Sequence, residues 1–351
     1  MHRRPVQAVM AVLALLVLGL GGFVLAARLG AFSMPLAELR QRYETPHSRY
    51  VRLDGVDLHV DDRGQGPVIV LVHGHYQSLR IWDKWADTLS RDYRVIRIDM
   101  PPYGLSGPDI TGKYSPQRVE QLIALLAKRE GLRRFSIGGI STGSAIAMRY
   151  SLQHPNQITS LILVNAPLVP IAPRLQPKTS ATLAFLENNL FRPVYRPQAF
   201  YRYLLGRLIA NKAVLTDDLV RQTWDMHRKP GNQATLDQFT SALRFEASDY
   251  GKRSQTTAQK LGSVRVPTLV LWGGAGSMLP LSVGCDVART VGRPGTVMIS
   301  YPGAGHFLPI EAPGAAQDIA WFLGDTNTNI GDNAVKKPGS RPPFGRQEAC
   351  H

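Results

Sequence analysis

One serine in the sequence has the surroundings of an activated nucleophile. Gly139-Ile140-Ser141-Thr142-Gly143 follows the apolar stretch Arg134–Ile137, which is typical of a strand, and opens a helical pattern. A serine at such a corner sits in a tight, strained turn that exposes its hydroxyl, and the two glycines leave room for the close backbones. The start of the helix also stabilises developing negative charge. We predict that Ser141 is a nucleophile rather than part of a structural glycine turn.

A histidine that can act as general base follows the last predicted strand. His306 lies in the glycine-rich segment Pro302–Phe307, directly after the strand-like stretch Thr296–Tyr301. A loop at this end of a strand can fold over the edge of the sheet and bring an imidazole to the Ser141 hydroxyl. This position sets His306 apart from the other histidines, for which a surface or packing role is expected.

A second loop offers backbone donors for an oxyanion. His73-Gly74-His75 ends and follows the apolar run Pro67–His73. We expect the backbone N–H groups of His75 and Thr142 to bind the oxyanion that forms when a serine attacks a carbonyl. His73 is expected to pack or to turn the chain, because a second base is unnecessary.

The elements that must position these residues are visible in the hydrophobic pattern. Continuous apolar runs, of the kind buried on both faces of a parallel sheet, recur along the chain. They are Pro67–His73, Tyr93–Ile98, Arg134–Ile137, Ile158–Val164, Pro267–Trp272 and Thr296–Tyr301. Helical patterns lie between several of them, the clearest of which begins with Ser115 as N-cap and runs to about Arg129. This alternation predicts a doubly wound, mostly parallel α/β sheet, and the strandless interval from Leu168 to about Gly262 predicts a helical insertion.

The ordered motifs resemble the α/β-hydrolase family. The segments that carry the resemblance are LVHGHYQSLRIWDKWADTL, IDMPPYGLSG, GGISTGS, SLILVNAP, VPTLVLWGG and YPGAGHFLPIEAP. The resemblance implies a hydrolase core at residues 48–167 and 263–324, with a helical cap at 168–262. It also implies Ser141 as nucleophile, His306 as base, and the N–H groups of His75 and Thr142 as the oxyanion hole.

One position departs from the family's pattern. Members that resemble this chain usually carry an aspartate shortly after the strand that ends here at Trp272, and the corresponding position is Gly276. No carboxylate follows Trp272 until Asp286. Asn165 occupies a position where dehalogenase-like members place their acid, and its side-chain oxygen could accept the Nδ1–H of His306 and orient the ring. An asparagine that caps local backbone at the end of a strand is the competing interpretation.

A serine nucleophile narrows the chemistry that the resemblance implies. Dehalogenases and epoxide hydrolases of this fold attack with an aspartate, whose ester intermediate a serine cannot form. The remaining reactions are acyl transfers to water from esters, lipids, thioesters or activated carbon–carbon bonds. The sequence has no phosphate-binding loop, metal motif or dinucleotide fingerprint, so no cofactor is expected. We predict a serine hydrolase of small to medium apolar carboxylic esters, slowed by the missing acid. The alternative is a non-catalytic binding or scaffold protein on the same fold.

The N-terminal segment predicts attachment to a membrane. Arg3 and Arg4 precede a nearly unbroken apolar run over residues 8–27. At about 1.5 Å per residue this run spans roughly 30 Å, the thickness of a bilayer's hydrocarbon core. The arginines predict a cytoplasmic segment 1–7, a linker at 28–47 and a periplasmic or extracellular body. Val24-Leu25-Ala26 also resembles a signal-peptide cleavage site, but the run exceeds the roughly 7–15 residues of a usual signal core, which favours an uncleaved anchor.

Composition excludes some classes of protein and favours others. The 351 residues are 44% hydrophobic and 19% charged, which excludes a disordered chain and supports a large core. The 41 basic and 26 acidic residues give a net charge of +15, which favours an acidic membrane surface over nucleic acid because no nucleic-acid-binding motif accompanies it. The stretch Phe191–Lys212 mixes aromatic and basic residues without an acid and suits a membrane interface. An ordinary cap helix with solvated arginines is the favoured interpretation of that stretch.

The number of cysteines and the composition of the C-terminal segment limit what those parts of the chain can form. Two cysteines, Cys285 and Cys350, exclude a disulfide-rich scaffold or a four-cysteine zinc site, and whether they pair stays open. Residues 325–351 contain many Gly, Pro, Asn and Lys residues and almost no aliphatic ones, so we expect a disordered tail.

Overall fold

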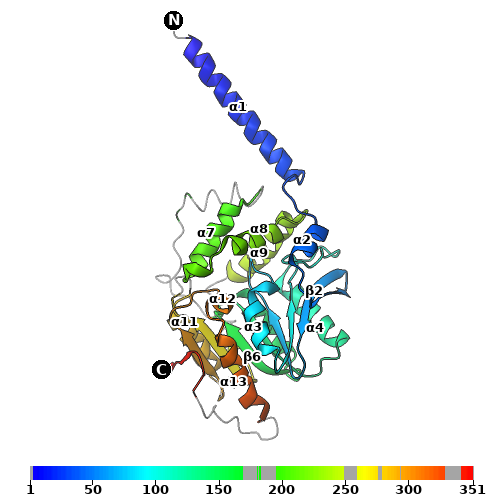
Figure 1. Ribbon diagram of the computed structural model, residues 1–351, viewed down its shortest axis with the longest axis vertical. Helices are drawn as coiled ribbons and strands as arrows, with labels where there is room; N and C mark the ends of the chain where they lie inside the picture. Colours follow the sequence, from blue (N-terminus) through cyan, green and yellow to red (C-terminus); the bar gives the residue numbers. More distant parts are fainter. Residues whose placement is uncertain are drawn as a thin grey trace.

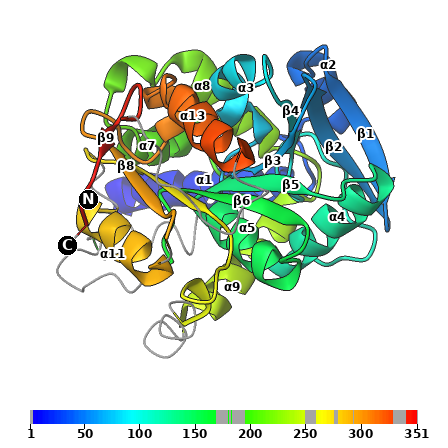
Figure 2. The ribbon, with the colours of Figure 1, turned by 90° about the horizontal axis from the view of Figure 1, so that it is seen from below.

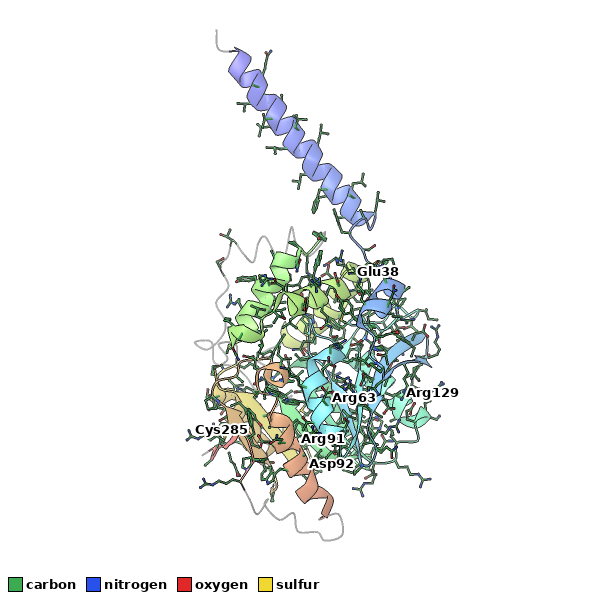
Figure 3. The ribbon with its side chains drawn as sticks, viewed as in Figure 1. Glu38, Arg63, Arg91, Asp92, Arg129 and Cys285 are labelled. Carbon is green, nitrogen blue, oxygen red and sulfur yellow. A yellow bond between two sulfur atoms is a disulfide. The ribbon has the colours of Figure 1, made fainter. Side chains whose placement is uncertain are left out.

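The computed structural model describes residues 3–168, 180, 182, 195–248, 259–275, 279–292, 294–328 and 341–350. A long helix, α1 (Arg3–Arg28), projects away from the body of the chain, as Figure 1 shows. It is apolar over Gln7–Ala27, with a mean hydropathy of 2.7, and none of its most apolar stretch is buried. Side chains extend outward along most of the length of α1 (Figure 3). By length and composition, α1 can cross a membrane.

A mixed sheet forms the centre of the body, with the strand order β1-β2-β4-β3-β5-β6-β7-β8-β9. The strands are β1 (Ser48–Leu53), β2 (Val56–Arg63), β3 (Val68–Val72), β4 (Arg94–Ile98), β5 (Phe135–Ile140), β6 (Ile158–Val164), β7 (Thr268–Gly273), β8 (Val297–Tyr301) and β9 (Arg346–Gln347). Strands β3 to β8 pair in parallel, and β1, β2 and β9 add antiparallel pairs at the two edges. This confirms the doubly wound, mostly parallel α/β class.

Helices cover both faces of the sheet (Figure 2). They are α3 (Asp83–Leu89), α4 (Pro116–Arg129), α5 (Thr142–Gln153), α11 (Leu281–Val291), α12 (Leu308–Glu311) and α13 (Ala315–Thr328), with a 3₁₀ turn, η1 (Leu79–Trp82). Helices α4, α5 and α11 contribute to one buried apolar cluster, and α3 and α13 contribute to the other. As predicted, Ser115 caps α4, because its hydroxyl accepts the Arg118 N–H at 3.2 Å.

A helical insertion follows β6 and precedes β7. Its described helices are α7 (Gln198–Leu208), α8 (Asp217–Met226) and α9 (Asn232–Ser248), with a 3₁₀ turn, η4 (Lys212–Val214). We refer to these elements, with the flanking residues 195–197 and 227–231, as the cap. In Figure 1 the cap lies between the end of α1 and the sheet.

The segment between α1 and the sheet is attached to the cap. It contains a short helix, α2 (Leu36–Tyr43). The Met34 N–H donates to the carbonyl of Arg228 at 2.7 Å, and the Tyr43 hydroxyl donates to the Asp225 carboxylate at 2.7 Å. The predicted linker therefore has defined structure and fixes the end of α1 against the cap.

The prediction of a disordered tail over residues 325–351 is wrong for its described part. Helix α13 runs to Thr328, and residues 341–350 lie along the edge of the sheet, where β9 pairs with β8. The Asp318 carboxylate accepts the N–H groups of Phe344 and Gly345, both at 2.8 Å, and a disulfide joins Cys285 to Cys350. Figure 3 labels Cys285 at this edge. A few specific contacts and one covalent bond therefore order a segment that has almost no aliphatic residues.

Candidate active site

Ser141 occupies a strained turn between β5 and α5. Its backbone angles are φ 54° and ψ −119°, a region that residues other than glycine rarely adopt. A Cβ added at Gly139 would lie 2.1 Å from the backbone carbon of Gly143, and one added at Gly143 would lie 2.2 Å from the Val72 carbonyl oxygen. The two glycines therefore allow α5 to start against the ends of β3 and β5, and this close packing holds the serine in its unusual conformation.

The loop after β3 lies directly against this turn. A Cβ added at Gly74 would be 3.2 Å from the Cβ of Ser141, so the two backbones are in close contact. Thr142 is the first residue of α5, and its N–H has no acceptor within the helix. The His75 backbone follows Gly74, and the Gln77 side chain fixes this loop by accepting the Gly74 N–H at 2.8 Å. The structure thus brings the segments of both predicted oxyanion donors to the serine.

The side chain of His75 points toward the cap. Its Nδ1 is hydrogen-bonded to the Tyr103 hydroxyl, and its Nε2 lies 3.5 Å from the hydroxyl of Thr240 on α9. Its ring is stacked on Phe239, with the two centroids 6.3 Å apart. The imidazole therefore forms part of the contact between the core and the cap.

His73 has the packing role that the sequence predicts. It is fully buried; its Nδ1 donates to the Gly74 carbonyl at 2.8 Å, and its Nε2 accepts the Met100 N–H at 3.0 Å. Burial lowers the pKa of His73. A neutral ring with both nitrogens engaged by backbone is a structural element and not a base.

His306 lies in the loop between β8 and α12, and the cap holds its backbone. The His306 N–H donates to the carbonyl of Leu208, at the end of α7, at 2.8 Å. The imidazole is 6% exposed, and burial lowers the pKa of His306 to about 4. Its Nδ1 has no hydrogen-bond partner among the residues that the structure describes. The ring is therefore neutral at pH 7, as a base must be, but none of the acidic residues that the structure describes orients it.

Asn165 supports the backbone of the histidine loop and not the imidazole. Its side-chain NH₂ donates to the carbonyls of His306 at 2.8 Å and Gly305 at 3.2 Å, and its side-chain oxygen accepts the Gly273 N–H at 3.0 Å. The amide is thus directed at backbone groups, and His306 Nδ1 has no partner among the described residues, so the interpretation of Asn165 as the partner of Nδ1 is wrong. The competing interpretation, an asparagine that caps local backbone, is also wrong: the amide bonds to backbone, but its partners lie on β7 and in the histidine loop, 108 to 141 positions away.

The end of β6 connects the two predicted catalytic residues. The Ser141 N–H donates to the carbonyl of Val164 at 2.9 Å, and the next residue, Asn165, bonds to the His306 carbonyl. Ser141 and His306 are therefore each attached to the same strand end. Gly276 lies outside the described residues, and Asp286 is paired with Arg289 on the surface of α11.

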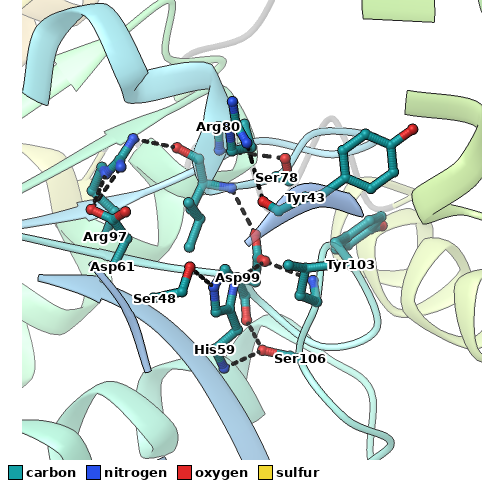
Figure 4. A network of polar contacts seen from close by, with 12 residues as sticks. Tyr43, Ser48, His59, Asp61, Ser78, Arg80, Arg97, Asp99, Tyr103 and Ser106 are labelled. Atoms are coloured by element: carbon teal, nitrogen blue, oxygen red, sulfur yellow. Dashed lines mark hydrogen bonds and ion pairs between the residues drawn. The ribbon is translucent and has the colours of Figure 1, made fainter. Parts of the chain in front are cut away.

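A buried carboxylate that sequence reasoning missed organises the loop after β4 (Figure 4). Asp99 accepts hydrogen bonds from the N–H groups of Leu79 and Leu105, both at 2.7 Å, and lies 2.6 Å from His59 Nδ1. Burial would raise the pKa of Asp99, but the hydrogen bonds, first that from His59, lower it. The loop that closes around Asp99 carries Tyr103, whose hydroxyl contacts His75. The only signal in the sequence was the motif IDMPPYGLSG, which gives no role to its aspartate.

Comparison with known proteins shows the class of the protein. Residues 67–313 match the model of the α/β-hydrolase fold family, and the chain belongs to that family. It is 24% identical over 297 residues to a 2-hydroxy-6-oxononadienedioate/2-hydroxy-6-oxononatrienedioate hydrolase of Cupriavidus pinatubonensis, an alignment that covers 80% of this chain and 97% of that protein.

Solved structures share the fold. A membrane phospholipase A superimposes with a TM-score of 0.64 at 23% identity, over 93% of this chain and 100% of that chain. A meta-cleavage product hydrolase from Pseudomonas fluorescens IP01 superimposes with a TM-score of 0.64 at 19% identity, over 80% of this chain and 98% of that chain.

Proposed function

We propose that this protein is a serine hydrolase of small to medium apolar carboxylic esters, with Ser141 as the nucleophile. The observation that carries the proposal is the strained backbone of Ser141, at φ 54° and ψ −119° between two glycines that tolerate no side chain. A conformation of this kind costs about 1–3 kcal/mol and recurs at active sites, where strain serves the reaction. Membership of the α/β-hydrolase fold family also supports a hydrolase.

In the proposed reaction, Ser141 Oγ attacks the ester carbonyl carbon and His306 Nε2 takes the hydroxyl proton. The N–H groups of His75 and Thr142 bind the oxyanion of the tetrahedral intermediate. The alcohol then leaves with the proton from His306, and the acyl group stays on Ser141. A water molecule that His306 deprotonates attacks the acyl-enzyme, which releases the carboxylic acid and restores the serine.

The lack of an aspartate at Gly276, the family's usual position for the acid, supports slow turnover. In a triad enzyme, loss of the carboxylate's charge reduces the rate on the order of 10⁴-fold, yet the nucleophile and oxyanion hole still catalyse. The Nδ1 of His306, which has no partner in the described part of the chain, also favours a second candidate function, a non-catalytic binding protein that kept the fold after losing the acid.

Labelling with a fluorophosphonate probe separates the two candidates, because the probe needs an activated serine but no known substrate. The proposal predicts covalent labelling of the full-length chain that Ser141→Ala abolishes. Ser263→Ala, at an exposed serine, is the matched control and should label normally. Absence of labelling, or labelling that persists in Ser141→Ala, would establish the binding protein as the better candidate.

The proposal includes anchoring by α1, with residues 1–7 in the cytoplasm and the hydrolase body outside it. The leading arginines favour this orientation. The disulfide between Cys285 and Cys350 adds independent support, because such bonds persist in oxidising compartments. Membrane fractionation of the full-length chain and of a chain without residues 1–27 tests the anchor. Release of the full-length protein by high salt alone would contradict it.

A further inference from the structure

A cavity of about 410 Å³ lies where the end of α1 meets the cap. Ala27, Gly30 and Phe32 line one side of it, and Arg196, His227 and Lys229 line the other. Its volume falls within the range of small-molecule sites, about 300–1,000 Å³. None of the predicted catalytic residues lines it, so it is distinct from the candidate active site.

Several buried polar atoms at this cavity have no partner in the part of the chain that the structure describes. Arg196 is 3% exposed, yet its Nε and Nη1 have no hydrogen-bond partner of normal geometry among the described residues, although the Tyr201 side chain interacts with the guanidinium. The Nε2 of His227 and the Nε of Arg228 are buried and unpartnered as well. A buried donor without an acceptor is unfavourable, and more so when it is charged. Their gathering around one cavity indicates a ligand that completes these bonds.

The charged residues around the cavity indicate the chemistry of the ligand's headgroup. Arg196, Arg228 and Lys229 are the basic side chains. Arg228 is paired with Asp225 at 2.6 Å, and the one acidic side chain among the described lining residues, Asp237, accepts from Arg196 Nη2 at 3.2 Å. Burial lowers the pKa of Lys229 to about 7, and its Nζ donates only to carbonyls, those of Tyr103 and Ser106, among the described residues. An oxyanion is the complement of this set.

His227 adds a second requirement. Its Nδ1 donates to the Thr223 carbonyl at 2.6 Å, and burial lowers the pKa of His227 to about 3. The ring is therefore neutral, and its unpartnered Nε2 is an acceptor. A headgroup that carries a hydroxyl beside its oxyanion can accept hydrogen bonds from Arg196 and donate one to His227 Nε2.

The remaining wall suits an acyl chain at a membrane surface. Phe32 lies 4.9 Å from Tyr195 and 5.3 Å from Phe23 of α1, measured between ring centroids. Aromatic rings of this kind favour the boundary between headgroups and hydrocarbon. The cluster continues from the cavity toward α1, along the direction from which a lipid would arrive.

We infer that this cavity is a binding site for an anionic lipid whose head combines a phosphate with a hydroxyl, as phosphoglycerol does. Arg196 and Lys229 bind the phosphate, His227 accepts the hydroxyl, and the aromatic cluster contacts the acyl chain. The site holds a lipid beside the cap and needs no nucleophile.

Quenching of Trp224 fluorescence reports on this cavity, because the Trp224 indole N–H donates to the Arg196 carbonyl at 3.1 Å. The probe is lysophosphatidylglycerol with a brominated acyl chain, added to the full-length chain in phosphatidylcholine nanodiscs. The Ser141→Ala background prevents turnover, so the outcome is independent of the proposed hydrolase function. We expect saturable quenching that disappears in Trp224→Phe.

The variants test the recognition of the head. Arg196→Gln should weaken binding about tenfold or more, because charged hydrogen bonds are lost. Arg202→Gln, at a half-exposed arginine of α7, is the matched control and should leave the binding affinity unchanged. Brominated lysophosphatidylcholine, which is zwitterionic and has no hydroxyl in its headgroup, should bind about tenfold more weakly. If Arg196→Gln does not fold, as judged by its melting curve, Lys229→Gln replaces it with the same expected direction.

Three results would overturn the inference. The first is equal quenching by the two lysolipids, and the second is unchanged binding in the folded Arg196→Gln or Lys229→Gln variant. The third is displacement of the probe by inorganic phosphate or glycerol 3-phosphate as readily as by unbrominated lysophosphatidylglycerol. That result would assign the cavity to a soluble phosphate and not to a lipid.

Discussion

Replacement of Asn165 by aspartate distinguishes a residue that holds the histidine loop from one that orients the imidazole. The two residues have nearly the same shape, and both tolerate the positive φ of this position, 44°. The change converts an NH₂ group that faces the carbonyl oxygens of His306 and Gly305 into a second oxygen. The bond that the other oxygen accepts from Gly273 is retained.

The expected loss of stability depends on pH. At low pH the carboxyl is protonated and can donate to one carbonyl only, so the other is left unsatisfied at a cost of about 1–3 kcal/mol. Burial against carbonyl oxygens should raise the pKa of the new carboxyl from about 4 to about 6. The folded state then keeps a proton that the unfolded state releases, so stability falls as the pH rises through this interval. At about 1.4 kcal/mol per pH unit, the further loss is about 3 kcal/mol.

Urea unfolding of the detergent-solubilised chain, followed by tryptophan fluorescence at about pH 4 and about pH 7, measures this loss. Asn156→Asp, at an exposed asparagine, is the matched control and should cost little at either pH. If Asn165 instead oriented the ring, the added charge beside the imidazolium would raise ester hydrolysis. A more active variant, or one as stable as the wild type at both pH values, would refute the assignment of Asn165 to the loop backbone.

The remaining predictions concern the base, the serine turn and the tail. Because burial lowers the pKa of His306 to about 4, the rate of ester hydrolysis should stay level from about pH 7 to about pH 5. The free energy of unfolding should fall below about pH 6.5, because there only the unfolded state takes up the proton. A rate that falls with a midpoint near pH 6.5 contradicts this prediction. Gly139→Ala, whose Cβ would lie 2.1 Å from a backbone atom, should abolish fluorophosphonate labelling and lower the melting temperature, whereas Gly303→Ala, with nothing within 4 Å, should change neither. Replacing Cys285 and Cys350, 65 residues apart, by serine should reduce the free energy of unfolding by about 4 kcal/mol, and an unchanged urea midpoint would refute a stabilising bridge.

The parts of the fold that were predictable from the sequence are those whose causes are local. Strand β3 and the second half of β6, Leu161–Val164, are runs of apolar residues, because burial on both faces favours apolar side chains. The start of α4 is determined by Ser115 and the proline that follows it. The strained turn of Ser141 was predictable for the same reason, because the glycines that it needs stand two residues away.

The parts that were not predictable depend on contacts between distant segments. Asn165 bonds to residues 108 and 141 positions away, and nothing in the strand that precedes it indicates which carbonyls its amide will meet. The C-terminal residues appear disordered by composition, yet the Asp318 carboxylate and one disulfide order them. In each case a single polar side chain or cysteine determines the structure, and a hydrophobic pattern contains no information about it.

Backbone hydrogen bonds hold the cap at two points, one at the loop of His306 and the other at the segment that follows α1. At one end the carbonyl of Leu208 accepts the His306 N–H at 2.8 Å, and at the other the carbonyl of Arg228 accepts the Met34 N–H at 2.7 Å. Helices α7 and α8 pack together between these points. A shift of α1 in a membrane would therefore act on the His306 backbone through the cap. Both Ser141 and His306 are held by the end of β6, but of the two backbones only that of His306 also bonds to a described residue of the cap. Any influence of the membrane on activity should then change the base and its pH dependence, and leave the reactivity of the serine turn itself unaltered.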